Sequence, residues 1–153
     1  MATMIISSPI GELTLTVNEQ AVTRLDFGVM AREPLKETPL LLEAARQLEA
    51  YFDGSLREFT VPLEPQGTAF QRKVWDALRS IPYGGRVTYS DIAQRVDNPK
   101  GVRAVGMANN RNPLPIFIPC HRVVGKNGSL VGYGGGLAVK ERLLGLEKSQ
   151  ERG

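Results

Sequence analysis

The sequence predicts an α+β fold in two parts. Residues 1–66 are expected to form an N-terminal antiparallel β-sheet with one helix, acting as a support domain. Residues 67–153 are expected to form a mainly helical C-terminal domain with a winged helix-turn-helix-like motif. Three observations predict this: short strand-like runs in the first quarter, capped helical segments in the second half, and a proline-containing stretch between them.

The first part contains three short runs of alternating or β-branched residues, bounded by turn residues. The runs are residues 4–7, 12–17 and 21–27, with turns at 8–11 and 18–20. Thr38 and Pro39 then begin a helix, because Thr caps free backbone N–H groups and Pro fits the first turn. Apolar residues recur at helical spacing as far as Phe52, and Asp53-Gly54 ends the helix.

An extended stretch carrying Pro62 and Pro65 marks the boundary between the two parts. After it, Thr68 and Gln71 have the spacing of a capping box, which begins a helix. Two short helices joined by a tight turn follow in a basic region, a pattern that indicates a helix-turn-helix. These helices span residues 88–96 and 102–110, and a last helix spans about 138–146.

The composition excludes several classes of protein. One Cys and one His among 153 residues exclude an intramolecular disulfide, an ordinary Cys/His zinc site and a redox cycle with a second Cys. There is no run of 18 apolar residues, and the N-terminus lacks the pattern of a signal peptide. We therefore expect a cytoplasmic protein without membrane association, nucleoid-associated in a bacterium or nuclear in a eukaryote.

The net charge of +3 hides an asymmetry between the two parts. Residues 1–68 contain five Lys and Arg against ten Asp and Glu, whereas residues 69–153 contain 14 against six. The basic part also holds the Cys and the His. Such a distribution indicates a polyanionic partner, with ordinary surface charge as the alternative.

Cys120 is the candidate nucleophile. It follows the apolar run 116–119 and directly precedes His121 and Arg122. Positive or hydrogen-bonding neighbours favour the thiolate, although a lone buried Cys is commonly inert and structural. In a fully extended segment Cys120 and His121 would face opposite ways, so a relay between them needs a bend or a bridging water. This argues against a simple Cys/His dyad.

The sequence around Cys120 resembles the active-site signature of the O6-alkylguanine-DNA alkyltransferases. The signature is the run Ile118-Pro119-Cys120-His121-Arg122-Val123-Val124-Gly125. Further matching positions lie on both sides of it: Thr68, Phe70-Gln71, Val74-Trp75, Ile81-Pro82, Arg103-Ala104-Val105-Gly106, Asn112-Pro113, Gly132-Tyr133, Gly135-Gly136 and Lys140. The resemblance covers about residues 68–147, and the N-terminal part matches only in its pattern of elements.

The resemblance implies a DNA-repair protein that moves an alkyl group from O6 of guanine in duplex DNA to Cys120. The thioether product cannot be released, so each molecule acts once. His121 would pass the Cys proton through a water to Glu147, and Tyr89 would protonate guanine N3 as a general acid. The remaining implied positions are the hinge Asn112 and the pocket residues Val123, Tyr133 and Gly134.

The resemblance also implies binding in the minor groove and extrusion of the damaged nucleotide. Arg103 would fill the vacated space in the base stack. The small residues Ala104 and Gly106 would let the second helix of the pair approach the DNA closely, and Tyr89 and Arg111 would add contacts. The partner is then double-stranded DNA containing O6-alkylguanine. We expect a monomer with no cofactor, no metal and no obligate protein partner.

Two other functions compete with this one. A non-transferring sensor of alkylated DNA would bind the lesion without reacting. A Cys-dependent hydrolase would turn over more than once and would not need DNA.

Overall fold

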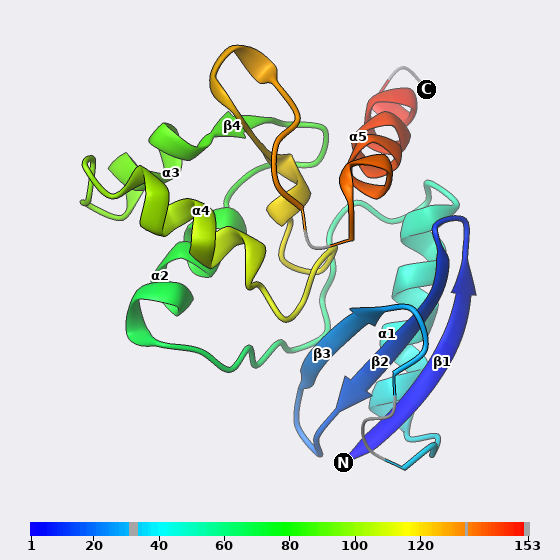
Figure 1. Cartoon of the computed structure of the whole chain (residues 1–153). Coiled ribbons are helices and arrows are strands. Elements are labelled where there is room, and N and C mark those ends of the chain that lie inside the picture. Colours follow the sequence, from blue (N-terminus) through cyan, green and yellow to red (C-terminus); the bar gives the residue numbers. More distant parts are fainter. Residues whose placement is uncertain (31–33, 134, 152–153) are drawn as a thin grey trace. The chain divides into compact units, whose positions relative to one another are not determined.

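The computed structural model describes residues 1–30, 34–133 and 135–151, and the chain forms two compact units, Met1–Gln66 and Gly67–Gly153 (Figure 1). The first unit contains a three-stranded antiparallel sheet and a helix. In the second unit the described residues form four α-helices, two 3₁₀ turns and a small parallel sheet. The predicted α+β fold is therefore confirmed.

The sheet of the first unit consists of β1 (Ala2–Ser8), β2 (Gly11–Val17) and β3 (Val22–Phe27), in that order. All pairs are antiparallel, and each predicted strand forms within two residues of its expected bounds. Because side chains alternate along a strand, Leu13 and Leu15 of β2 share one face, and both are fully buried. This face forms the core of the unit.

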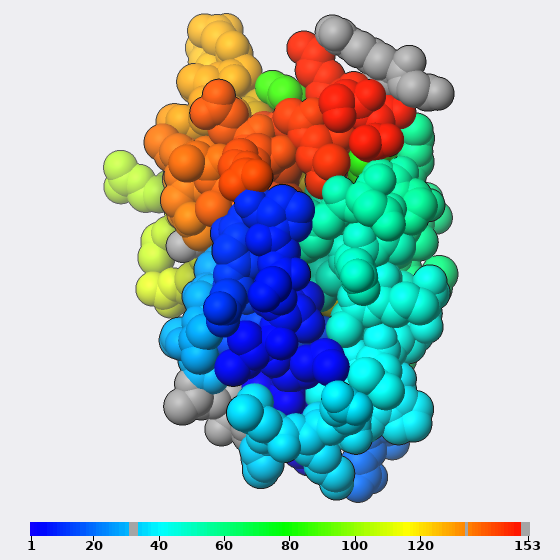
Figure 2. Space-filling view, turned by 90° about the vertical axis from the view of Figure 1, so that its right-hand side faces the viewer, coloured from blue at the N-terminus to red at the C-terminus, as the bar shows by residue number. Residues whose placement is uncertain are grey.

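Helix α1 (Pro39–Phe52) covers that face of the sheet (Figure 1). Its start is as predicted, because Thr38 Oγ1 accepts a hydrogen bond from Leu41 N at 3.2 Å. It ends at Asp53, and Gly54 follows with a φ of +87°. Figure 2 shows β1 in blue beside α1 in cyan, as expected for elements that share one core.

The extended stretch that carries Pro62 and Pro65 is hydrogen-bonded to the first unit. Val22 N donates to the Pro62 carbonyl at 2.8 Å, and Glu64 N donates to the Val22 carbonyl at 2.9 Å. The segment therefore runs parallel to β3 and belongs to this unit.

Helix α2 (Ala69–Leu78) opens the second unit with the predicted capping box. Gln71 N donates to Thr68 Oγ1 at 3.0 Å, and Thr68 N donates to Gln71 Oε1 at 2.9 Å. The helix buries Trp75, whose indole Nε1 donates to the Ala108 carbonyl at 2.8 Å. This bond fixes α2 against the helix that contains Ala108.

Helices α3 (Tyr89–Arg95) and α4 (Val102–Asn110) form the predicted helix pair. A second capping box, made by Thr88 and Asp91, begins α3. The turn between the helices contains Asp97 with a φ of +57°, a left-handed conformation that Asp tolerates better than most residues. The two helices pack on each other and on α2.

The Cys-containing segment returns to the start of α3. It comprises the 3₁₀ turn η1 (Cys120–Arg122), the strand β5 (Val123–Val124) and the 3₁₀ turn η2 (Lys126–Gly128). Strand β5 pairs in parallel with β4 (Val87–Thr88), directly before Tyr89. Two segments that are far apart in the sequence are thereby joined.

Helix α5 (Leu137–Glu151) is longer than the predicted last helix. Its buried positions share one face and include two charged residues; they are Lys140, Leu143, Leu144 and Glu147. Among the described residues, no helix combines the length and the apolar character that a membrane crossing requires.

Candidate active site

Cys120 begins the turn η1, and this turn provides the bend that the sequence argument required. Cys120 N donates to the Ile118 carbonyl at 2.7 Å, and Arg122 N donates to the Pro119 carbonyl at 3.0 Å. In a 3₁₀ turn successive side chains are rotated by about 120°, so neighbours do not face opposite ways. The Cys120 side chain is buried, with 4% of its residue surface exposed.

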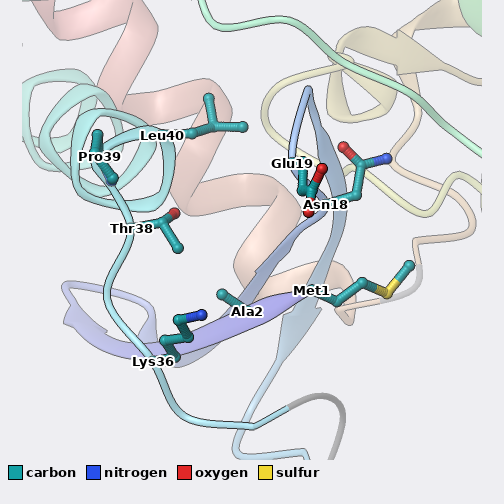
Figure 3. Close-up of a pocket in the computed structure, with 8 residues that line it drawn as sticks. All are labelled: Met1, Ala2, Asn18, Glu19, Lys36, Thr38, Pro39 and Leu40. Carbon is teal, nitrogen blue, oxygen red and sulfur yellow. The ribbon is translucent and has the colours of Figure 1, made fainter.

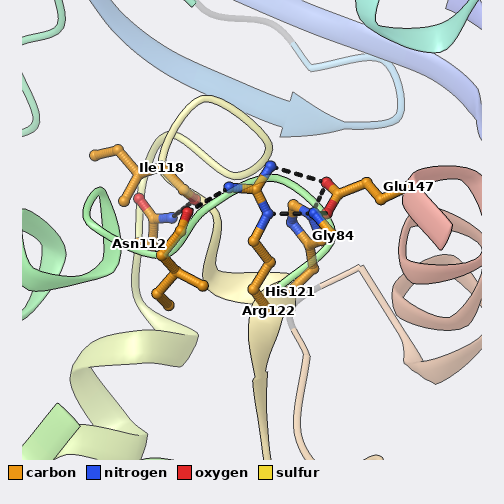
Figure 4. Close-up of polar contacts among 7 residues, drawn as sticks. Gly84, Asn112, Ile118, His121, Arg122 and Glu147 are labelled. Carbon is orange, nitrogen blue, oxygen red and sulfur yellow. Dashed lines mark hydrogen bonds and ion pairs between the residues drawn. The ribbon is translucent and has the colours of Figure 1, made fainter. Parts of the chain in front are cut away.

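A buried network of charged side chains follows Cys120 (Figure 4). His121 Nε2 lies 2.6 Å from Glu147 Oε2. Arg122 holds the same carboxylate with two hydrogen bonds, from Nε at 2.9 Å and from Nη2 at 3.0 Å. Gly84 N also donates to Glu147, at 3.1 Å, and Arg122 Nη1 donates to the Ile81 carbonyl at 2.8 Å. The network thus joins η1, α5 and the turn after α2.

The network fixes the protonation of the His121 ring. Burial alone would raise the pKa of Glu147, but the hydrogen bonds and charges of His121 and Arg122 lower it to about 2. Burial lowers the pKa of His121; Glu147 opposes this, while the cations Arg122 and Lys140 add to it. An ionised carboxylate can only accept, so Nε2 of the neutral ring donates to it and Nδ1 is the basic nitrogen. Within the described ranges, Nδ1 has no hydrogen-bond partner.

The Cys120 thiol needs such a base. Burial raises its pKa to about 11, although hydrogen bonding by Asn112, the positive charge of Lys140 and hydrogen bonding by Tyr133 oppose the rise. At neutral pH an isolated thiol in this position holds its proton. A thiolate therefore forms when a neighbouring group takes that proton.

Asn112 secures the loop that leads to Cys120. Its Nδ2 donates to the Ile118 carbonyl at 2.9 Å (Figure 4). Its Oδ1 accepts from Leu114 N, also at 2.9 Å. Both ends of the amide are therefore used within this loop. The same side chain contacts the thiol, so one residue links loop geometry to the environment of the sulfur.

Tyr89 and Lys140 meet at the Val131 carbonyl. The Tyr89 hydroxyl donates to it at 3.0 Å, and the buried Lys140 Nζ donates to it at the same distance. Lys140 also donates to the Val123 carbonyl at 2.6 Å, and its Nζ lies 5.9 Å from the centre of the Tyr89 ring. Helix α5 is thus connected to β5, to the start of α3 and to the segment around Val131.

Comparison with known proteins assigns this arrangement to a family. The 6-O-methylguanine DNA methyltransferase DNA binding domain matches residues 69–149, and the ribonuclease-like domain of the same proteins matches residues 1–65. The chain belongs to the 6-O-methylguanine DNA methyltransferase family.

Several named proteins are similar to this chain in sequence. The chain is 50% identical to the methylated-DNA–protein-cysteine methyltransferase of Methanosarcina acetivorans, over 95% of this chain and 97% of that protein. It is 48% identical to the constitutive enzyme of that name from Bacillus subtilis, over 92% of each. The crystal structure of Mycobacterium tuberculosis OGT in complex with DNA has a TM-score of 0.91 at 44% identity, covering 98% of this chain and 94% of that one.

Two pocket positions expected in a member of this family surround the same turn. Val123 is fully buried in β5, and its carbonyl is the acceptor for Lys140. Tyr133 is half-buried and contacts the Cys120 thiol. Gly134 lies outside the described residues. Cys120, His121, Glu147, Asn112, Tyr89 and Tyr133 are thus brought into one connected region of the second unit.

Three of the expected DNA-contacting positions lie on α4: Arg103, Ala104 and Gly106. Arg103 and Ala104 are exposed, and so is Arg111 directly after the helix. Gly106 is half-buried beneath this surface, where an added Cβ would lie 3.9 Å from the Tyr89 ring. In this family member, the exposed basic surface formed by Arg103 and Arg111 is thus distinct from the buried charged side chains around Cys120.

The roles of Arg122 and Lys140 were not predicted from the sequence. Arg122 was treated only as a positive neighbour of Cys120, whereas it holds the Glu147 carboxylate. Lys140 and Glu147 are seven residues apart and share a helical face with Leu143, which was an available signal.

Two further features of the described residues, the cavities of the first unit and the clusters of acidic side chains, were compared with this site. Two cavities of about 410 Å³ lie in the first unit, and neither is lined by Cys or His. Figure 3 shows one of them, lined by Met1, Ala2, Asn18, Glu19, Lys36, Thr38, Pro39 and Leu40. Across the described ranges there is no group of three or more His, Cys, Asp or Glu that could hold a metal ion.

Proposed function

We propose that this protein repairs DNA by transferring the alkyl group of O6-alkylguanine in duplex DNA to Cys120. The observation that carries the proposal is the geometry at Cys120: the sole Cys lies in a buried turn, next to a neutral His whose other nitrogen is held by an ion-paired Glu147. The family and the names of its relatives support the same chemistry.

The thiolate forms by proton transfer to His121. Nε2 donates to Glu147, so Nδ1 accepts the Cys120 proton through a bridging water. The resulting imidazolium lies 2.6 Å from an ionised carboxylate, which stabilises it. Charge is conserved inside the buried site, so the thiolate arises without release of a proton to solvent.

The transfer is a displacement at the alkyl carbon. A sulfur–carbon bond forms as the carbon–O6 bond breaks, and the electron pair of the broken bond moves onto guanine. Tyr89 gives its hydroxyl proton to guanine N3, so guanine leaves as a neutral base. Tyr133 and the Val123 backbone line the pocket that receives the base.

The reaction ends after one turnover. Water does not displace a thiolate from a thioether, and the chain contains no second Cys to take over the alkyl group. The protein is therefore a stoichiometric reagent, consumed as it repairs.

The target carbon is inside the base stack, so the nucleotide must be flipped out of the duplex. The exposed surface of α4 is suited to the minor groove because Ala104 and Gly106 are small. Arg103 enters the space that the flipped base leaves, and Arg111 contacts the backbone.

Intact-mass measurement tests this function. The protein is incubated with a duplex that contains one O6-methylguanine, and the mass is measured before and after digestion. We expect one methyl group per protein at saturation, on the peptide with Cys120. A bound but unmodified protein would identify a sensor, and lesion loss beyond one equivalent would identify a hydrolase; either result overturns the proposal.

A further inference from the structure

The Glu147 carboxylate is held on both of its oxygens (Figure 4). Oε1 accepts from Arg122 Nε at 2.9 Å and from Gly84 N at 3.1 Å. Oε2 accepts from Arg122 Nη2 at 3.0 Å and lies 2.6 Å from His121 Nε2. A carboxylate has about four lone-pair positions, of which Arg122 and Gly84 fill three. The position that remains faces the His121 ring.

Arg122 is itself fixed by the turn after α2. Its Nη1 donates to the Ile81 carbonyl at 2.8 Å, and its guanidinium carbon lies 5.6 Å from the centre of the Tyr83 ring. Both residues belong to the turn that also supplies the Gly84 N–H. A guanidinium is planar and rigid, so a contact at one edge determines the direction of the fork at the other. The orientation of the Glu147 carboxylate is therefore set by Arg122 and this turn.

Stability alone does not account for this ion pair. Arg122 and Glu147 are both buried. The cost of removing two charges from water largely offsets their attraction, and apolar side chains of similar volume often stabilise a protein as well. A forked contact differs from apolar packing because it fixes a direction. Here the direction that it fixes is the one in which the His121 ring lies.

We propose that Arg122 is a positioning residue that selects the tautomer of His121, because it leaves Glu147 an acceptor position aimed at Nε2. This rests on the proposed function, in which Nδ1 accepts the Cys120 proton through a water. With the hydrogen of the neutral ring on Nε2, Nδ1 keeps its lone pair for that proton. The ring then holds both hydrogens as an imidazolium, since Glu147 is already saturated with donors. The negative charge stays on the sulfur, where it can attack the alkyl carbon.

The tautomer can be measured directly, because the chain contains a single His. In protein labelled with ¹⁵N at histidine, the chemical shifts of the two ring nitrogens report which of them carries the hydrogen. We expect the hydrogen on Nε2 in the wild type. Arg122→Lys keeps the charge but replaces the fork with a point donor. In that variant the two signals should move toward each other, as in a mixture of the two tautomers.

A double-mutant cycle tests whether Arg122 acts through Glu147. Single-turnover methyl transfer at saturating duplex is measured for the wild type, Arg122→Met, Glu147→Gln and the double variant. Arg122→Met should slow transfer about tenfold or more, the effect of losing a hydrogen bond to a charged group. In the Glu147→Gln background the same change should add less than about twofold, because no carboxylate is left to orient. The duplex concentration that gives half the maximal rate should not change, since Arg122 is buried.

Arg142→Met is the matched control, because Arg142 is exposed on α5. Should Arg122→Met fail to fold, Arg122→Lys replaces it in the cycle. The role of Arg122 would be overturned if the Lys variant kept the hydrogen on Nε2 and the wild-type rate, or if the two substitutions had independent, multiplying effects. Failure of the proposed function looks different: the wild type would gain no methyl group, while its ring signals would still report the tautomer.

Discussion

Both units of this protein bury polar side chains, but they bury different kinds. The first unit buries mostly neutral groups, such as Gln47, whose amide exchanges two hydrogen bonds with Thr60. The second buries four charged or titratable groups close to one Cys: His121, Arg122, Lys140 and Glu147. Buried charge is expensive and adds little stability, so the second arrangement indicates chemistry and the first indicates support.

Removal of the sulfur gives the largest expected effect. Cys120→Ala should abolish methyl transfer, while affinity for the methylated duplex stays within about twofold, because the proposed DNA contacts of Arg103, Ala104 and Arg111 do not involve the sulfur. Fluorescence anisotropy measures binding, and intact mass measures transfer. If a folded variant lost both, Cys120 would be a structural residue and the contrast between the units would disappear.

Loss of the Glu147 charge should have the next largest effect. Glu147→Gln should slow transfer about 100-fold or more, because a neutral amide does not stabilise the His121 imidazolium. It should also reduce the free energy of unfolding by about 3 kcal/mol, since Arg122 stays buried without its counterion.

Glu141→Gln is the matched control, because Glu141 is exposed on the same helix. Single-turnover kinetics and urea unfolding of both variants make the comparison. Equal rates for the two variants would rule out Glu147 as the stabilising anion.

A substitution on the exposed surface of the second unit should affect only the reaction with duplex DNA. Arg103→Ala should slow transfer from duplex about tenfold or more, because flipping leaves unstacked bases without support. Transfer from free O6-methylguanine base should stay close to the wild-type rate, with Arg142→Ala on α5 as an exposed control. Equal slowing with both substrates would place Arg103 in the chemistry instead.

The pH dependence of stability should distinguish the buried ion pair of Glu147 from an exposed ion pair in the first unit. Glu147 has a pKa lowered from 4.5 to about 2, so its stabilisation is complete above pH 4.5 and is lost as the pH falls toward 2. The difference in unfolding free energy between wild type and Glu147→Gln should shrink over that range. Glu43 also has a pKa of about 2, but its partner Arg46 is exposed, so 1 M salt should weaken that pair much more. If the difference in unfolding free energy between wild type and Glu147→Gln did not change with pH, the buried pairing of Glu147 would be contradicted.

Local signals in the sequence were sufficient for most of the fold. The capping box at Thr68 and Gln71, the Thr38 cap and the helix pair each depend on residues within four positions of one another, and all are present. The pairing of β4 with β5 was not predicted, because its two-residue strands lie 36 positions apart and carry too few side chains for a period to show.

The candidate site likewise contains some residues that local sequence signals predicted and others that they did not. Cys120 and His121 are adjacent in the sequence, and the need for a bend between them could be stated in advance. Arg122 and Lys140 acquire their partners only when α5 packs against η1 and β5, so their neighbours in sequence do not reveal them. The buried face of α5 was not predicted because it contains charged residues, whereas a buried helix face is expected to be apolar.

The smallest expected effect on activity comes from the first unit. Gln47→Leu keeps the shape of the side chain but removes both hydrogen bonds to Thr60, and Thr60 is exposed enough for water to replace them. The free energy of unfolding should fall by only about 1 kcal/mol. Methyl transfer should be unchanged, because the bonds that Gln47 loses all lie within residues 1–66. Urea unfolding and single-turnover kinetics on one preparation measure both quantities. A loss of transfer rate comparable with that of Glu147→Gln, in a folded variant, would show that neutral polar packing in the first unit governs the chemistry of the second.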